Sequence, residues 1–134
     1  LGCAQIEKIE ELIIGRRQAA RRMTEDIVDI PGIEPPTEAF GRHVYQLYTV
    51  TLDPTINRTQ VIKELEAHNI DSKIYWDTPI HRTEPYADGA IGSDTLRNTD
   101  EIASRVLSLP IHPEIGRDET DRIVEALATA VDTS

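Results

Sequence analysis

Three side chains suited to ligand chemistry lie within one short stretch of the sequence, I-Y-W-D-T-P-I-H-R-T-E-P-Y from Ile74 to Tyr86. Trp76 and Tyr86 offer aromatic faces, and His81 is the residue type that gains or loses a proton near neutral pH. Pro79 lacks a backbone donor and fixes one torsion angle, so neither a strand nor a helix continues easily through His81. We therefore expect a loop, and loops held by a rigid scaffold often bind ligands.

The other residues that could do chemistry form no recognisable site in the sequence. The four histidines lack the close spacing to cysteine, carboxylate or one another that metal sites usually show, so we expect no metal. There is no glycine-rich phosphate loop, no G-x-S-x-G and no cysteine with an obvious activating partner. His81 and His112 each stand close to a proline and could meet in space, or each could be a loop residue with one backbone hydrogen bond.

Composition limits the classes of partner. The chain has 134 residues, 39% of them hydrophobic, which is enough for one domain with its own core. Its 14 basic and 24 acidic residues give a net charge of −10, which disfavours nucleic acid and anionic membranes as partners. A lone cysteine, Cys3, and the lack of a membrane-length apolar run or leader-like segment favour a cytoplasmic setting.

The spacing of apolar residues predicts the elements that must position the loop. A long amphipathic helix is expected in residues 1–28, with its apolar stripe between Gln5 and Val28, and a breaker-rich connection follows it. The order of helices and strands indicates one α+β domain over residues 1–134, with a small antiparallel-type sheet covered by helices. The further predicted elements are strands at His43–Leu52, Ile70–Trp76 and Val106–Leu109, and helices from Asn57 to about His68, from Thr99 to about Arg105, and from Arg117 almost to the end.

Helix ends are predicted from local spacing. Asn57 with Gln60, and Asn98 with Glu101, have the spacing of reciprocal N-terminal caps. Asn69 is expected to adopt the left-handed conformation that often ends a helix.

Four stretches together resemble the C-terminal part of the DegT/DnrJ/StrS aminotransferases, which use pyridoxal phosphate to aminate keto groups of nucleotide-linked sugars. They are L-G-C-A-Q-I-E-K-I at Leu1–Ile9, H-V-Y-Q-L-Y-T-V at His43–Val50, the loop at Ile74–Tyr86, and L-S-L-P-I-H-P at Leu107–Pro113. The resemblance implies the small domain of a fold-type I enzyme that works as a homodimer, joined by its first helix to a large domain that precedes Leu1.

The resemblance also implies roles for individual residues. His81 corresponds to a loop histidine near the substrate, which can donate a hydrogen bond to a carboxylate or phosphate, or can move a proton. Trp76 stands where a tyrosine is common, Tyr86 closes the loop, and Gln46 stands where many relatives carry histidine. These four residues are the expected substrate-binding set.

The cofactor and catalytic residues of such an enzyme are expected outside this chain. The Schiff-base lysine and the phosphate-holding residues belong to the large domain, and Lys8, Lys63 and Lys73 match none of them. We therefore expect pyridoxal phosphate, the nucleotide sugar and the amino donor to bind the full-length protein, and the isolated chain to be inactive. The alternative is a free-standing regulatory or ligand-binding α+β module.

The scarcity of lysine and the spread of Asp and Glu along the chain suggest a source that lives in high salt. Cations would then screen the repulsion between the acidic side chains. We predict that the thermal unfolding midpoint rises as KCl is increased to molar concentration, measured by circular dichroism. An unfolding midpoint that does not respond to molar salt contradicts this prediction.

Overall fold

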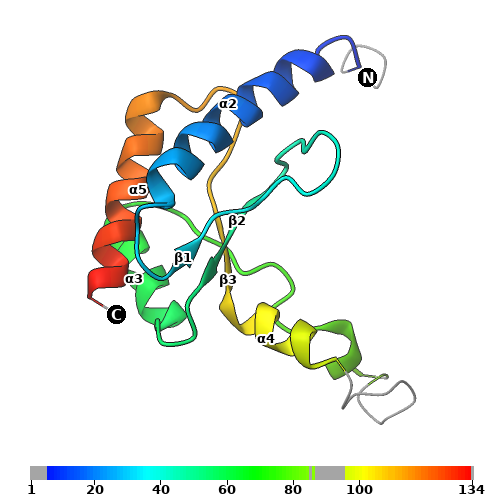
Figure 1. Ribbon diagram of the computed structural model, residues 1–134, viewed down its shortest axis with the longest axis vertical. Helices are drawn as coiled ribbons and strands as arrows, with labels where there is room; N and C mark the ends of the chain where they lie inside the picture. Colours follow the sequence, from blue (N-terminus) through cyan, green and yellow to red (C-terminus); the bar gives the residue numbers. More distant parts are fainter. Residues whose placement is uncertain (1–5, 85, 87–95, 134) are drawn as a thin grey trace.

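A three-stranded antiparallel sheet with the order β1-β2-β3 lies beside three longer helices in the computed structural model, which describes residues 6–84, 86 and 96–133 (Figure 1). Helices α2, α3 and α5 pack together on one side of the sheet, and α4 projects away from it. This arrangement confirms the predicted α+β class. The elements in chain order are α2 (Ile9–Ile27), β1 (Ile33–Glu34), β2 (Tyr48–Leu52), α3 (Arg58–Ala67), the 3-10 helix η1 (Ile80–Arg82), α4 (Arg97–Arg105), β3 (Val106–Leu109) and α5 (Arg117–Asp132).

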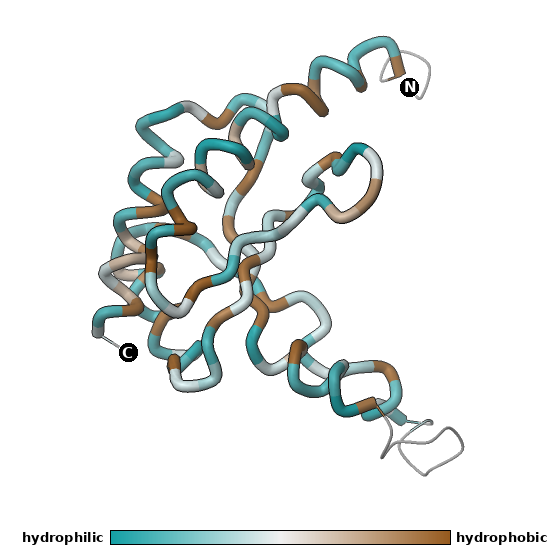
Figure 2. Tube along the Cα trace, viewed as in Figure 1, coloured by the Kyte–Doolittle hydropathy of each residue, from teal (hydrophilic) through white to brown (hydrophobic). Residues whose placement is uncertain are grey.

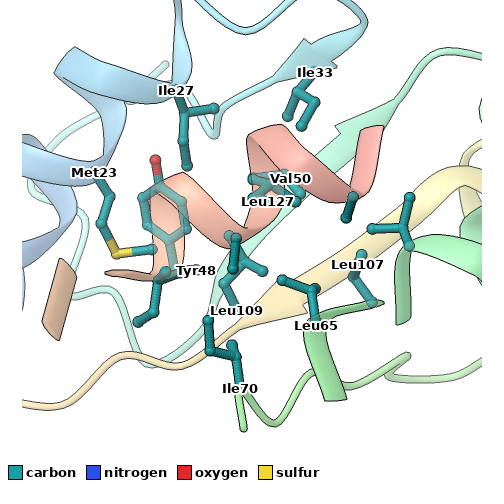
Figure 3. Close-up of a cluster of buried hydrophobic side chains, with 14 of the residues drawn as sticks. Met23, Ile27, Ile33, Tyr48, Val50, Leu65, Ile70, Leu107, Leu109 and Leu127 are labelled. Atoms are coloured by element: carbon teal, nitrogen blue, oxygen red, sulfur yellow. The ribbon is translucent and has the colours of Figure 1, made fainter. Parts of the chain in front are cut away.

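The central strand β2 supplies the middle of the core. Its side chains alternate, with Tyr48, Val50 and Leu52 buried and the two threonines between them half-buried. In the antiparallel register, Tyr48 pairs with Leu109 of β3. Figure 3 shows these strand residues meeting side chains from α2, α3 and α5 in one cluster. Strand β2 therefore buries one face, as period-two alternation requires, whereas Leu107, Ser108 and Leu109 of β3 are all buried.

Helix α2 joins the core only through its second half. Ala20, Met23 and Ile27 are buried, whereas Ile6 and Ile9 are 67% and 48% exposed. Figure 2 shows apolar positions continuing along the part of α2 that extends beyond the other helices. The predicted apolar stripe is thus present but only partly covered, and its start at Gln5 lies outside the described residues.

Helix α5 begins at Arg117 as predicted and packs between α2 and α3. Ile123 and Leu127 are buried, and Val124 and Val131 pack against the core from its edge. None of the described helices has the length and apolar character that crossing a bilayer requires.

Two predicted strands are shorter than expected or missing. The strand expected at His43–Leu52 begins only at Tyr48, because Tyr45 has a positive φ of 46° that extended backbone does not allow. The segment Ile70–Trp76 forms no strand: a single bridge joins Lys73 to Ser108, and Trp76 has a φ of 55°. The predicted alternation in burial does hold from Ile70 to Tyr75 and ends at the exposed Trp76, but hydrogen-bonded pairing does not extend beyond the bridge.

The helix ends test the predicted caps. The side chain of Asn57 accepts hydrogen bonds from the backbone of Thr59 and Gln60, and Asn69 has a φ of 57°, so both predictions are confirmed. The Asn98–Glu101 cap is wrong, because α4 begins at Arg97, two residues before the predicted start at Thr99, and its N-cap residue, Leu96, makes no side-chain cap. The two-residue strand β1 was not predicted and forms inside the breaker-rich connection.

Helix α2 approaches the segment after β3 closely at Gly15. A Cβ atom added to Gly15 would overlap the backbone carbonyl of Pro113. About two helical turns further on, the guanidinium of Arg22 donates a 3.0 Å hydrogen bond to the backbone carbonyl of Ile115. The absence of a side chain at position 15 therefore sets the distance between α2 and this segment.

We predict that Gly15→Ala lowers the free energy of unfolding by about 1–3 kcal/mol, because the added methyl forces α2 away from Pro113. Without this overlap, alanine in place of glycine inside a helix would stabilise it by about 1 kcal/mol. A fall in the free energy of unfolding therefore indicates the overlap with Pro113, and a rise contradicts it. The measurement is urea unfolding of both chains. Gly116→Ser is the control: it adds a side chain where no atom lies within 4 Å, and it should leave stability unchanged or slightly higher.

The side chain of Tyr48 is buried, and its phenol shares a 2.8 Å hydrogen bond with Thr24. We therefore predict that the domain loses stability at high pH, where this phenol ionises. Burial raises the pKa of Tyr48 to about 12, whereas an unfolded tyrosine ionises near pH ~10. The stabilisation is therefore complete below about pH 10 and is lost as the pH rises through the folded pKa. Between these values, unfolding free energy should fall more steeply for the parent chain than for Tyr48→Phe. Parallel curves would show that Tyr48 ionises freely in the folded chain.

Candidate functional site

The candidate loop leaves the sheet at Lys73 and is shaped by its own backbone hydrogen bonds. Lys73 exchanges two backbone hydrogen bonds with Ser108 of β3, at 3.0 and 2.8 Å. Beyond Trp76 and Pro79 the chain forms the single turn η1, where the backbone N–H of Arg82 donates to the carbonyl of Pro79 at 2.8 Å. The prediction was that neither a strand nor a helix continues easily through His81; the structure has no strand there and a single 3-10 turn that ends at Arg82.

His81 lies in η1 and is held by Asp100 of α4. The ring is only 8% exposed, and its Nε2 lies 2.9 Å from Oδ1 of Asp100. The guanidinium of Arg82 donates two hydrogen bonds to the same carboxylate, from Nη2 to Oδ2 at 2.6 Å and from Nε to Oδ1 at 3.2 Å. One carboxylate therefore fixes two consecutive residues of the loop.

The electrostatics of Asp100 follow from this geometry. The hydrogen bond from Arg82 is the largest cause that holds the pKa of Asp100 below its usual range; the hydrogen bond with His81 adds to it, and partial burial opposes both. Asp100 is therefore ionised at neutral pH. Its stabilising contribution is present above the ordinary carboxyl pKa and is lost as the pH falls through the lowered value.

A second ionic contact holds the start of the loop. Arg58, the first residue of α3, donates from Nη2 to Oδ1 of Asp77 at 2.8 Å. The other terminal nitrogen of Arg58 donates to the carbonyls of Ala103 and Val106, at 2.7 and 3.2 Å, where α4 meets β3. Arg58 thus ties the loop and α4 to the helix that packs on the sheet.

The other predicted site residues lie at different places. Trp76 is 77% exposed, and its ring lies 6.1 Å from the ring of Tyr75. Tyr86 is 43% exposed, and its backbone N–H donates to Thr83 at 2.8 Å. Gln46 is exposed and lines a hollow of about 210 Å³ together with Tyr75. Gln46 therefore shares a hollow with Tyr75, the residue before Trp76. His81 is buried at a separate position.

Sequence reasoning missed the residues that hold the loop, Asp100 and Arg58. Asp100 stands in the first turn of α4, where an acidic residue is ordinary because it complements the helix dipole. Arg58 follows an N-terminal cap and has the appearance of a solvated helix residue. No local spacing connects either residue to the loop.

Other charged groups do not extend the site. A larger hollow of about 590 Å³ lies between α2 and residues 36–45, and Arg17 in its wall pairs with Glu38 at 3.0 Å. His112 lies 3.7 Å from Glu119, so it has a different carboxylate partner from His81. Among the described residues there is no group of three or more His, Cys, Asp or Glu side chains that could hold a metal.

Comparison with known proteins identifies the family. The family model described as the DegT/DnrJ/EryC1/StrS aminotransferase family matches residues 1–128. GDP-perosamine synthase of Caulobacter vibrioides is 30% identical over 131 residues, which cover 95% of this chain and 34% of that protein. The dTDP-3-amino-3,4,6-trideoxy-alpha-D-glucose transaminase of Streptomyces venezuelae is 32% identical over 115 residues, which cover 84% of this chain and 30% of that protein.

A solved structure agrees with these sequence relatives. The crystal structure of DesI in the presence of its TDP-sugar product has a TM-score of 0.88 at 27% identity, covering 98% of this chain and 34% of that chain. The chain spans about a third of the length of the curated relatives it matches. Since the family model matches nearly the whole sequence, the chain belongs to the DegT/DnrJ/EryC1/StrS aminotransferase family.

Proposed function

We propose that this chain is the C-terminal small domain of a pyridoxal-phosphate-dependent aminotransferase that acts on nucleotide-linked keto sugars. In this proposal the loop from Trp76 to Tyr86 faces the substrate, and the active enzyme is a homodimer that takes its amino group from an amino-acid donor. The family match supports the reaction class. The named relatives, which include a GDP-linked and a dTDP-linked sugar enzyme, support the substrate class.

The observation that carries the role of the loop is the buried, carboxylate-held His81. A histidine fixed in one orientation can position a substrate group or hold a proton at a defined atom. The exposed ring of Trp76 offers a flat apolar face for a sugar or a base, since a large aromatic surface left in water gains free energy when a ligand covers it. Gln46 and Tyr86 would add amide and phenol hydrogen bonds at the edges.

The lysines of this chain do not fit a cofactor site. In an aminotransferase, pyridoxal phosphate is held by a lysine and supplies the electron sink for the chemistry. Such a lysine needs a desolvated or charge-tuned pocket, whereas Lys8, Lys63 and Lys73 are all exposed. Lys73 also lies 3.6 Å from Asp71. This exposure supports the proposal that the cofactor lysine belongs to a part of the enzyme outside this chain.

The native protein gives the direct test. An antibody raised against this domain would capture the protein from its source, and borohydride reduction followed by intact mass measurement would detect a covalently reduced cofactor. We predict a mass well above the 15.0 kDa of this chain, increased further by a pyridoxyl group. The matched control is the 134-residue chain treated with pyridoxal phosphate and borohydride, which should show no stable aldimine absorbance band before reduction.

Two results would contradict the proposal. A native species near 15.0 kDa without an adduct would mean that the domain acts alone, as the binding-module alternative requires. A stable aldimine band on the chain itself would mean that one of its exposed lysines holds the cofactor after all.

A further inference from the structure

The guanidinium of Arg58 joins three parts of the domain at one point. Arg58 is the first residue of α3, a helix that the buried Val61 and Leu65 anchor in the core. One of its terminal nitrogens donates to Asp77 in the candidate loop, and the other donates to carbonyls at the end of α4. The side chain of Arg58 is only 18% exposed, and partly buried charges are screened less than exposed ones. Arg58 therefore connects a core helix to two segments that lie outside the core.

The contacts of Arg58 with α4 fall on the end of that helix. The last carbonyls of an α-helix have no partner within the helix, and a cation near them complements the helix dipole. Ala103 lies in the last turn of α4, and Val106 is the residue that caps it. Arg58 donates to the carbonyls of these two residues at 2.7 and 3.2 Å. A residue of α3 thus caps the C-terminal end of α4.

Helix α4 depends on such polar contacts because it buries no side chain. Figure 1 shows it projecting away from the sheet. At its first turn, Asp100 holds His81 and Arg82 of η1. At its last turn, Arg58 is joined by Arg105, whose Nε donates to the last carbonyl of β2 at 2.7 Å. The loop and α4 are therefore joined to each other at one end and to the core at the other.

We propose that Arg58 is a positioning residue for the candidate loop: through Asp77 and through the end of α4, it sets where residues 77–82 lie relative to the sheet. In this proposal residues 77–82 and α4 move together when Arg58 is lost, and the core stays folded. The importance of this placement for a substrate rests on the proposed function, in which the loop faces the substrate. Arg58 acts on that site only through other residues.

Backbone amide hydrogen exchange, measured by NMR on the 134-residue chain, follows each part separately. The amides of Arg82 and Thr83 donate within η1 and report on the loop. The amide of Val106 donates to α4 and reports on the end of that helix. Amides of the paired strands β2 and β3 report on the core.

We expect Arg58→Met to speed exchange at the loop and α4 amides about tenfold or more, which is the size expected when hydrogen bonds from a charged group are lost. The β2 and β3 amides should keep their rates. Arg58→Lys keeps the charge but not the directed contacts of a guanidinium, so it should restore only part of the protection. Arg21→Met is the matched control: Arg21 is exposed and pairs with Glu25 of its own helix, so no reporter amide should change.

Asp77→Asn separates the two routes by which Arg58 acts. It weakens the contact with the loop and leaves the contacts with the α4 carbonyls in place. Because the side chain of Asp77 is 66% exposed, we expect the loop amides to exchange only about two- to fivefold faster. The Val106 amide should not change. In the double variant Arg58→Met with Asp77→Asn, the loop amides should exchange as in Arg58→Met alone, since Asp77 has then already lost its partner.

Two patterns would overturn the positioning role. An equal increase at the loop, α4 and the β2 and β3 amides would show that Arg58 stabilises the whole domain without placing the loop. Unchanged loop amides in Arg58→Met or in Asp77→Asn would show that the loop keeps its position without Arg58. If Arg58→Met does not fold, Arg58→Lys and Asp77→Asn supply the same comparison. These rates need neither cofactor nor substrate, so this test can fail while the mass measurement on the native protein succeeds, and the reverse also holds.

Discussion

A strand buries only every second side chain, and the architecture of this domain follows from which face of β2 is covered. Tyr48, Val50 and Leu52 point toward the helices, and each needs apolar neighbours on that side. Helices α2, α3 and α5 meet this requirement together, because one helix is too narrow to cover a sheet of three strands. The site depends on the same strand, since β2 holds β3, and β3 holds both the start of the loop and the end of α4.

The elements that could be predicted are those in which residues close in sequence interact. The cap at Asn57 joins groups two and three residues apart, and the apolar face of α5 repeats at helical spacing, so both followed from local pattern. The loop around His81 was likewise predicted from Pro79. The strand at Ile70–Trp76 was wrong because its alternation describes burial, whereas a strand also requires a partner over its whole length, and β3 offers only Ser108.

The candidate site shows the same division between local and distant contacts. His81 was identified from its residue type and from the family resemblance, but its partner Asp100 lies 19 residues away. Arg58 is similarly distant from the loop and acts through a side chain that reaches the α4–β3 junction. A contact of this kind depends on how two elements are placed in space, so it becomes visible only when the fold is known. The first turn of α4 looks like an ordinary acidic helix start until the loop is seen beside it.

Two kinds of force thus hold two parts of the molecule. Apolar burial holds the sheet and its helices, whereas the loop and α4 are joined to them by hydrogen bonds and ion pairs, and α4 has no buried side chain. Substitutions that alter the apolar core and those that alter the exposed surface of the loop and α4 therefore fall largely on different residues. A lineage can change the exposed positions of the loop and α4 with little effect on folding, as long as the Asp100 and Arg58 contacts persist. Under the proposed function, this separation would allow substrate preference to diverge while the apolar core is kept.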